Sequence, residues 1–296
     1  MAVIDILLPY WGDVDYFKLA VSSVRSQDVA DWRLIIVDDG YPSDEPQRWV
    51  EGLADSRIEY HRNETNLGAN ANYRRALEMA TAPLTVMMGA DDVMLPTFVT
   101  TVLDAAGRHP EATVIQPGVE VIDGAGAVYL PLADRVKGWY APRLGSNLNE
   151  RVLSGQTMAR SLLRADWAYF PSLVWRTEVM QRLGFRTGLH VVQDLALLLD
   201  IAADGGSMLV LREVVFQYRR HGGSDSSVKA VNGARFDEER AFFATAAERF
   251  GHLGWDRAVR AARWHLTSRL NAATLLPTAV RVGGGAPRAL LRHILG

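Results

Sequence analysis

Two pairs of neighbouring carboxylates could do chemistry, and each pair comes soon after a short apolar run. Asp38 and Asp39 directly follow residues 33–37, and Asp91 and Asp92 follow residues 84–88 after two small residues. Both runs have the length and composition of buried strands. In an open α/β sheet, ligands bind outside the carboxyl ends of the strands, so both pairs could hold one ligand. Acidic residues also cap helices and shape turns, but the two pairs together, in this order, favour a ligand site.

Two later stretches carry further candidates. Asp194 begins an apolar segment with helical spacing, which would hold its carboxylate rigidly at a helix N-terminus. From the residues alone, such a carboxylate is expected to serve the helix dipole. Residues 218–224 combine two arginines, His221 and a serine at the end of an apolar run. From the residues alone, a histidine beside arginines is expected to have an ordinary surface role.

The elements that must position these residues alternate between strand and helix in the first part of the chain. Short apolar runs predict strands, and apolar residues at helical spacing predict helices. The predicted strands are residues 3–8, 33–37, 57–61 and 84–88, and the predicted helices are residues 14–26, 43–53 and 69–80. Strands separated by helices indicate a parallel sheet with crossover connections.

The pattern is looser after residue 110. Strands are expected at residues 112–116, 119–122, 173–175 and within 207–218, and helices at 191–203, 234–250, 255–273 and 287–295. Residues 131–150 contain proline, glycine and asparagine and are assigned to no element. We therefore expect a catalytic domain made of two halves, residues 1–110 and 111–232, followed by a C-terminal helical extension over residues 233–296.

The composition excludes several classes of protein. The chain has 296 residues, 48% of them hydrophobic and 22% charged, which suits a globular protein with a large core. The net charge of −2 gives no indication of nucleic-acid binding, and the absence of cysteine excludes disulfides and thiolate metal sites. No run of 18 apolar residues and no signal-peptide pattern is present. We expect a cytoplasmic protein.

The last helices are basic. From His252 to Gly296 there are seven arginines and one acidic residue, Asp256. Such a segment suits peripheral contact with an anionic membrane surface on the inner face of the membrane. Formation of a homo-oligomer and a plainly solvated face are the alternatives.

The opening of the chain resembles the family 2 glycosyltransferases, the inverting enzymes of the GT-A fold. Residues 3–40 (VIDILLPYWGDVDYFKLAVSSVRSQDVADWRLIIVDDG) follow the family's pattern of apolar strand, Pro-Thr/Tyr, helix, and apolar strand ending in Asp-Asp-Gly. Asn66-Leu67-Gly68 and Ala90-Asp91-Asp92 resemble its Asn-x-Gly loop and its acidic motif. The likeness is close over residues 3–98 and weaker to about residue 224. The sequence departs from the pattern at Gly89, where the family usually has an aspartate.

The resemblance implies an α/β fold of the GT-A type: a single Rossmann-like, mostly parallel sheet flanked by helices. Residues 1–110 would bind the nucleotide sugar, with UDP or dTDP favoured over GDP, and residues 111–232 would bind a hydroxyl-bearing acceptor. The acceptor would be a glycan, a lipid-linked molecule or a small molecule, as in cell-envelope polysaccharide synthesis or natural-product glycosylation. Mn²⁺ or Mg²⁺ on carboxylates would balance the charge of the departing diphosphate.

The resemblance also gives each site residue a role. Asp92 would hold the metal with help from His221, Asp91 would lie near the ribose, and Asp194 would be the general base. Asp39 would accept from the base ring, and Tyr10 would pack on or near it. The remaining residues expected to line the nucleotide are Pro9, Asp38, Asn66, Gly68, Asn72 and Arg219. The aromatic residues expected to contact the acceptor are Trp139, Trp167 and Trp175, for which a place in the core is the alternative.

Other functions fit less well. A sugar nucleotidylyltransferase should have a glycine-rich loop with a basic residue after the first strand, and residues 9–13 provide none. A dehydrogenase or an α/β-hydrolase would need G-x-G-x-x-G or G-x-S-x-G, and neither is present. A nucleotide-sugar-binding protein with a degenerate site remains an alternative. Gly89 favours it, as does the loss of a basic residue that the family has near Leu199 and Asp200.

Overall fold

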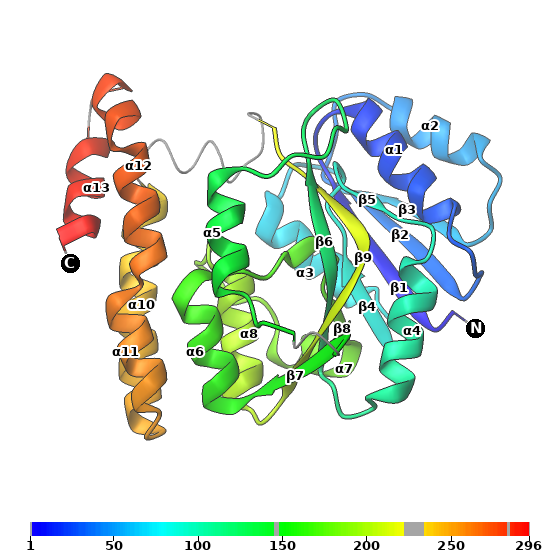
Figure 1. The fold of residues 1–296 in the computed structure, drawn as a ribbon. Coiled ribbons are helices and arrows are strands. Elements are labelled where there is room, and N and C mark those ends of the chain that lie inside the picture. Colours follow the sequence, from blue (N-terminus) through cyan, green and yellow to red (C-terminus); the bar gives the residue numbers. More distant parts are fainter. Residues whose placement is uncertain (1, 145–147, 222–233, 283–284, 296) are drawn as a thin grey trace.

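The strand β1 (Ile4–Tyr10) lies inside the sheet because its apolar residues alternate between two buried faces. Ile4, Ile6 and Leu8 pack into one core, and Leu7 packs into the core on the opposite face. Its neighbours β2 (Trp32–Asp38) and β4 (Leu84–Met87) both run parallel to it. The computed structural model describes residues 2–144, 148–221, 234–282 and 285–295, and over these ranges the chain forms one nine-stranded sheet (Figure 1).

The first third of the chain follows the predicted alternation. The helices and strands beyond β1, β2 and β4 are α1 (Val14–Arg25), α2 (Glu45–Gly52), β3 (Ile58–Arg62), α3 (Ala69–Glu78), β5 (Val93–Met94) and α4 (Phe98–Arg108). The order β3-β2-β1-β4 is parallel throughout, which confirms the crossover connections expected from the sequence. Asp38 and the 89–92 turn therefore lie at the same edge of the sheet.

The middle of the chain extends the sheet with strands of both directions. Its elements are β6 (Val114–Ile122), α5 (Leu132–Tyr140), β7 (Glu150–Ser154), α6 (Gly155–Ala165), a 3₁₀ turn η1 (Phe170–Ser172), β8 (Val174–Arg176), α7 (Thr177–Leu183), α8 (Gln193–Ala203) and β9 (Ser207–Arg219). β8 is antiparallel to β4 and β6, whereas β6 and β9 are parallel. β5 and β7 both pair antiparallel with β9. The whole sheet is therefore mixed, with its parallel half first.

Three local predictions differ from the structure. The strands expected at 112–116 and 119–122 are one strand, β6, which stays continuous across Gly118. A Cβ at Gly118 would lie 2.5 Å from the carbonyl oxygen of Glu213, so only glycine allows this approach of two backbones. Residues 132–140 form a helix where none was assigned. The helix expected over 255–273 is interrupted at His265, which has a φ of 24°.

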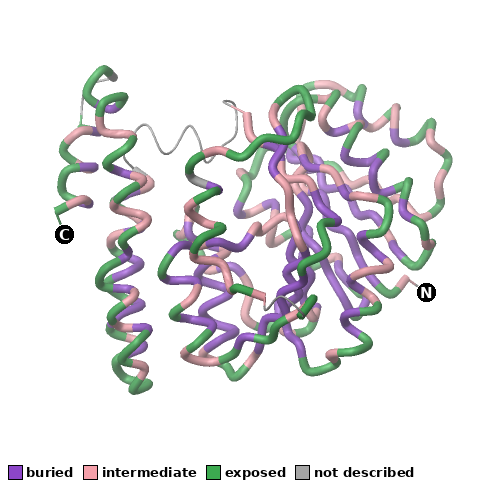
Figure 2. Tube along the Cα trace, viewed as in Figure 1, coloured by how far each residue is buried: buried purple, intermediate pink, exposed green. Residues whose placement is uncertain are grey.

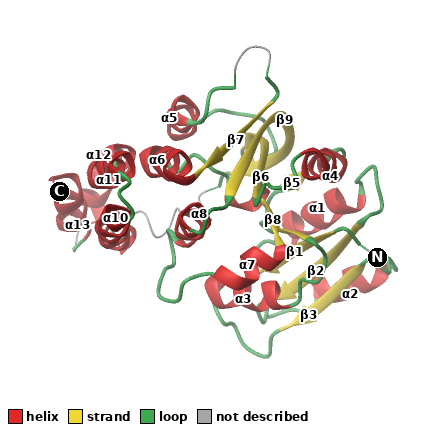
Figure 3. Cartoon of the chain, turned by 90° about the horizontal axis from the view of Figure 1, so that it is seen from below, coloured by secondary structure: helices red, strands yellow, loops and turns green. Residues whose placement is uncertain are grey.

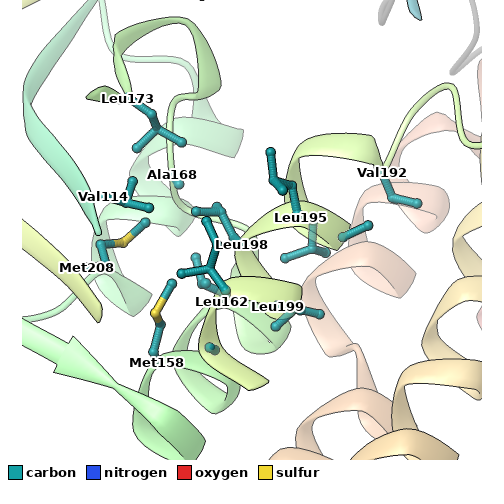
Figure 4. Close-up of a cluster of buried hydrophobic side chains, with 14 of the residues drawn as sticks. Val114, Met158, Leu162, Ala168, Leu173, Val192, Leu195, Leu198, Leu199 and Met208 are labelled. Carbon is teal, nitrogen blue, oxygen red and sulfur yellow. The ribbon is translucent and has the colours of Figure 1, made fainter. Parts of the chain in front are cut away.

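The helix α8 is buried almost all round. Leu195, Leu198 and Leu199 pack between α6 and the strands, together with Met158 and Met208 (Figure 4). In Figure 2 the buried residues, in purple, gather along the strands and on the helices that cover them. Because α8 is locked by packing, the residue at its first turn, Asp194, is held by a rigid element.

The C-terminal helices pack beside the sheet domain and form no separate sheet. They are α10 (Ala234–His252), α11 (Asp256–Trp264), α12 (Leu266–Val282) and α13 (Ala286–Leu295). α10 joins the main core through Phe242, Phe243 and Phe250, and α11 and α12 contact α6 (Figure 3). The expected helical extension is therefore present. Within the described ranges, no helix combines the length and the apolar character that crossing a membrane requires.

Candidate active site

Asp39, directly after β2, organises the loop that follows β3. Its Oδ1 accepts hydrogen bonds from Asn63 Nδ2 and the Leu67 amide, each at 2.8 Å, and its Oδ2 accepts from the Gly68 amide at 2.9 Å. Asn72 also belongs to this network, since its Oδ1 accepts from Asn63 Nδ2 and its Nδ2 donates to the carbonyl of Val37. Asp39 and the 63–72 segment thus form one preorganised edge.

The turn after Asp39 needs glycine. Gly40 has a φ of 73°, and a Cβ there would lie 2.9 Å from the carbonyl carbon of Thr65. The Asn66 side chain turns inward on its own loop, because its Oδ1 accepts from the Gly68 amide at 3.0 Å. The Asp-Asp-Gly motif therefore brings the 63–68 loop against the end of β2.

Asp38 and Tyr10 face the protein interior. Asp38 is fully buried and accepts from the Tyr41 amide at 2.7 Å and the Tyr60 hydroxyl at 2.6 Å. The ring of Tyr10 is also fully buried, 4.3 Å from Phe17 and 5.2 Å from Tyr41 between ring centroids. The exposed aromatic ring at this edge belongs to Trp11, 53% exposed, which the sequence reasoning did not select. Its position directly after Pro9-Tyr10 was the available signal.

The 89–92 turn folds two carboxylates back toward the strand. Asp92 is 1% exposed; its Oδ1 accepts from the Arg219 amide at 2.8 Å, and its Oδ2 is buried with no partner among the described residues. Burial, and then the charge of Asp91, raise the pKa of Asp92. A Cβ at Gly89 would lie 2.5 Å from Asp92 Oδ2 and 3.0 Å from Asp91 Oδ1. Glycine at this position is therefore what lets both carboxylates approach the strand end.

The end of β9 closes this site from the other side. Asp91 Oδ2 lies 2.9 Å from His221 Nε2. Arg219 is buried, and its guanidinium donates to the carbonyl oxygens of Asp91 at 2.7 Å and Asp123 at 2.9 Å. Arg219 thus holds the turns together, and its Nε and Nη1 donors are already engaged by carbonyl groups. The remainder of the 218–224 motif, residues 222–224, lies outside the described residues.

These side chains fit a cation that shares its shell with phosphate and water. Two observations favour such a site: Asp92 Oδ2 is buried with no partner in the described parts of the chain, and both carboxylates approach Gly89 closely. Across the part of the chain that is described, no three histidine or carboxylate side chains form a group that could hold a metal ion alone. Mg²⁺ and Mn²⁺ are often bound by one or two carboxylates plus substrate phosphates, so three protein ligands are not needed.

Asp194, in the first turn of α8, belongs to a second cluster of charged residues, together with Asp166, Lys137 and Arg235. Burial, and then the negative charge of Asp166, raise its pKa to about 7, while the Leu195 amide, which donates to its Oδ1 at 2.8 Å, and Lys137 act in the opposite direction. Asp166 ends α6 in a left-handed conformation, with a φ of 42°. Burial raises the pKa of Asp166 too, and Lys137 and Arg235 oppose that rise. Two acids and two cations from four elements therefore meet here.

Part of this cluster lies where the sequence reasoning gave no signal. Lys137 is on α5, in the stretch assigned to no element, and Arg235 is on α10, in the C-terminal extension. Nearby, the buried Asp134 accepts from Tyr169 at 2.9 Å and pairs with Arg220 at 2.8 Å. These contacts join α5 to the end of β9, and only the fold brings them together.

The aromatic candidates divide between core and surface. Trp167 and Trp175 are 4% and 1% exposed, so they lie in the core. A place in the core was the alternative to acceptor contact in the sequence analysis. Trp139, on α5, is 68% exposed. Of these three rings, Trp139 is the one available to a ligand.

Comparison with known proteins agrees with this geometry. The family model described as glycosyl transferase family 2 matches residues 5–163. A protein of Escherichia coli K12, whose name, WcaA, refers to glycosyl transfer in colanic acid biosynthesis, is 35% identical over 95 residues. That match spans 32% of this chain and 34% of the relative, about a third of its length.

Solved structures share the fold. TarS of S. aureus, residues 1–349 with UDP-GlcNAc, has a TM-score of 0.62 at 14% identity, covering 82% of this chain and 66% of that one. The mannosyltransferase PcManGT of Pyrobaculum calidifontis, with GDP-Man and Mn²⁺, has a TM-score of 0.64 at 17% identity, covering 98% and 78%. At these identities the likeness concerns the fold, a mixed α/β sheet flanked by helices of the GT-A type.

Proposed function

The chain belongs to glycosyl transferase family 2, and we propose that it transfers a sugar from a nucleoside-diphosphate sugar to a hydroxyl group, with inversion at the anomeric carbon. The observation that carries the proposal is the Oδ2 of Asp92, which is buried in the turn after β4 and has no hydrogen-bond partner among the described residues. A buried carboxylate without a partner is costly, and a cation brought in with the donor would satisfy it. UDP or dTDP is the expected carrier, rather than GDP.

The donor diphosphate would lie between the ends of β2 and β4. The cation, held by Asp92 with Asp91 and His221 beside it, would supply positive charge for the departing diphosphate. Among the described residues, the Oδ2 of Asp39 accepts one hydrogen bond, from the Gly68 amide. A carboxylate oxygen can accept two, so Oδ2 could also accept a hydrogen bond from the base ring. Trp11 offers an exposed ring at the same edge, together with Tyr10 and Pro9 behind it.

Asp194 is the proposed general base. It would take the proton of the acceptor hydroxyl as the bond to the anomeric carbon forms, in a single displacement. A carboxyl whose pKa is raised to about 7 is well matched to proton transfer near neutral pH. Its mounting on the packed helix α8 supports this role, because a base must keep a fixed position relative to the sugar.

We further propose the division of labour expected from the sequence. Residues 1–110 would bind the donor, residues 111–232 would bind the acceptor, and residues 233–296 would add the helical extension. Trp139 is the aromatic candidate for the acceptor. The seven arginines beyond His252 favour peripheral contact of a cytoplasmic protein with the inner membrane face, and self-association is the alternative use of the same surface.

A panel of nucleotides tests the function. UDP, dTDP, GDP and CDP, each with Mn²⁺, Mg²⁺ or EDTA, should separate by melting temperature, because a ligand that binds only the folded state raises it. We expect a pyrimidine nucleotide with Mn²⁺ or Mg²⁺ to give the largest shift, followed by measurable hydrolysis of the matching donor sugar. Stabilisation without any hydrolysis or transfer would instead indicate a binding protein with a degenerate site. No shift with any nucleotide would contradict the proposal.

A further inference from the structure

A pocket of about 460 Å³ opens between α6 and α11, away from the strand ends that carry the acidic pairs. Two arginines from each helix line it, one helical turn apart, and aromatic rings from the ends of α5 and α11 complete it. These residues are Arg160 and Arg164 of α6, Arg257 and Arg260 of α11, and Tyr140 and Trp264. α6 and α11 contact each other directly, so the pocket lies within packed structure.

Within the described residues, no carboxylate balances the positive charge of the pocket. No acidic residue lines it, and in the described parts of the chain none of its guanidinium groups pairs with a carboxylate. The guanidinium group of Arg164 lies over the ring of Tyr140, with 5.1 Å between the guanidinium carbon and the ring centroid. Like charges that converge in a concave site repel one another, and a bound anion removes this cost. Arginine is also the side chain best suited to bidentate contact with phosphate.

The rim of the pocket is apolar. Trp264 is 68% exposed, and Leu266, at the start of α12, is 46% exposed. A ligand with a phosphate and an apolar portion would satisfy both surfaces at once. The combination distinguishes this pocket from the nucleotide edge, where buried carboxylates would exclude a bare phosphate.

Two residues that line the pocket are close in the chain to members of the Asp194 cluster. Arg164 precedes Asp166 by two residues, and Asp166 is the acid whose charge acts on Asp194. Tyr140 lies one helical turn after Lys137, which acts on both acids. An acceptor held in the pocket by its phosphate could therefore extend its hydroxyl toward Asp194.

We propose that this arginine pocket binds the phosphate or diphosphate ester of a phosphate-bearing acceptor, with the apolar portion of the ligand over Trp264 and Leu266. The proposal rests on the function proposed above. The phosphate could belong to a soluble ester or to a lipid headgroup, since both present the same group to the arginines.

Calorimetry with inorganic pyrophosphate and sedimentation with vesicles test the pocket. Pyrophosphate is titrated in EDTA, so that no cation can carry it to Asp92. The variant Arg257→Gln with Arg260→Gln removes two exposed guanidinium groups of the pocket, and Arg281→Gln with Arg292→Gln is the matched control of equal charge on exposed positions outside it. We expect the pocket variant to bind pyrophosphate at least about tenfold more weakly, and the control variant to bind like the parent.

The vesicle arm identifies the source of the phosphate. Vesicles of phosphatidylglycerol and of phosphatidylcholine are compared with each variant. If the pocket variant, unlike the control, loses binding to phosphatidylglycerol vesicles, the phosphate is assigned to a lipid headgroup. If the pocket variant loses binding to pyrophosphate but keeps its binding to these vesicles, the phosphate is assigned to a soluble ester. If neither ligand distinguishes the pocket variant from the control, or neither binds the parent, the proposal is overturned.

Binding of UDP with Mn²⁺, measured on the same proteins, separates this inference from the proposed function. It should be equal in the parent, the pocket variant and the control. Equal nucleotide binding without arginine-dependent phosphate binding would overturn only the pocket. Arginine-dependent phosphate binding in a protein that binds no nucleotide would keep the pocket and overturn the function.

Discussion

Glu238, in the first turns of α10, accepts a hydrogen bond from the backbone amide of Val192, the residue that caps α8, at 3.0 Å. The same carboxylate also accepts from the amides of His190 and Val191, at 3.0 and 2.7 Å. One side chain of the C-terminal extension thus satisfies the free donors that lead into the helix carrying Asp194. The extension therefore supports the proposed catalytic base as well as adding its basic surface.

Glu238→Gln should test this support. The amide keeps an oxygen but loses the charge that strengthens all three hydrogen bonds, so we expect a loss of about 1–3 kcal/mol in the free energy of unfolding. Displacement of Asp194 should lower kcat by about tenfold or more, with nucleotide affinity unchanged. Urea unfolding and donor turnover measure both effects. Asp237→Asn, on the exposed neighbouring position, is the control, and equal behaviour of the two variants would contradict the role of Glu238.

Asp92→Asn should have opposite effects in EDTA and in Mn²⁺. Burial raises the pKa of Asp92, so the folded state favours the protonated acid and loses stability as pH rises through the unfolded value toward the folded one. At pH 7 without metal, the neutral asparagine should therefore raise the free energy of unfolding, by about 1 kcal/mol or more. It still offers an oxygen to the Arg219 amide.

In Mn²⁺ with nucleotide, the same variant should lose the stabilisation that the parent gains, because the amide is a poor ligand for the cation. Melting temperature with and without Mn²⁺ and UDP measures the difference. The assignment of Asp92 would be refuted by a variant whose melting temperature responds to Mn²⁺ and UDP as strongly as that of the parent.

Gly89→Ala should damage the same site by sterics alone. The new methyl group would lie 2.5 Å from Asp92 Oδ2, so the two carboxylates must move apart. We expect Mn²⁺-dependent nucleotide binding to weaken by about tenfold or more, with a modest loss of stability. Gly107→Ala, in α4, where nothing lies within 4 Å of the added Cβ, is the control. Calorimetry on both variants decides whether glycine at 89 is a requirement of this site or a sign of decay.

The sequence predicted which residues meet at the strand ends better than it predicted the cluster around Asp194, for a physical reason. The strands β1, β2 and β4 have short apolar runs that end in their polar residues, so local pattern alone places Asp39 and Asp92 at one edge. The segment that forms α5 has no such pattern, because Pro131 and Gly138 are typical of loops and argue against a helix. The partners of Asp194 come from α5, α6 and α10, and only tertiary packing brings those elements together.

Buried polar residues have contacts in the fold that the sequence alone does not show. Asn72 and Arg219, which belong to motifs expected at the nucleotide, each donate a hydrogen bond to a backbone carbonyl inside the fold. Trp11 and Lys137 were overlooked, because a single residue in a loop or a weak helix has no period to mark it. A sequence motif identifies which segments meet at a site and leaves open which side chains face the ligand.

The pH dependence of turnover should report the pair Asp194 and Asp166. A base must be deprotonated to act, so kcat/KM should rise with pH and level off above the pKa of Asp194, at about 7. Asp166→Asn removes the negative charge that raises this pKa and should move the rise to lower pH. Lys137→Met removes a positive charge that lowers it and should move the rise to higher pH. Shifts of opposite sign in the two variants are a result that a general loss of structure would not produce.

Asp194→Asn completes the test. It should retain nucleotide binding and lose transfer by about 10²–10⁴-fold, the range of a general base. The folded pKa of Asp194 lies above the ordinary aspartate value of 3.8, so ionisation of this acid costs stability as pH rises from below 4 to about 7. The variant should therefore unfold at a higher urea concentration than the parent at pH 8, and at nearly the same concentration at pH 4. A stable variant with parental turnover would show that the base lies elsewhere. Asp166, the other carboxyl group of this cluster whose pKa is raised, would then be the next residue to test.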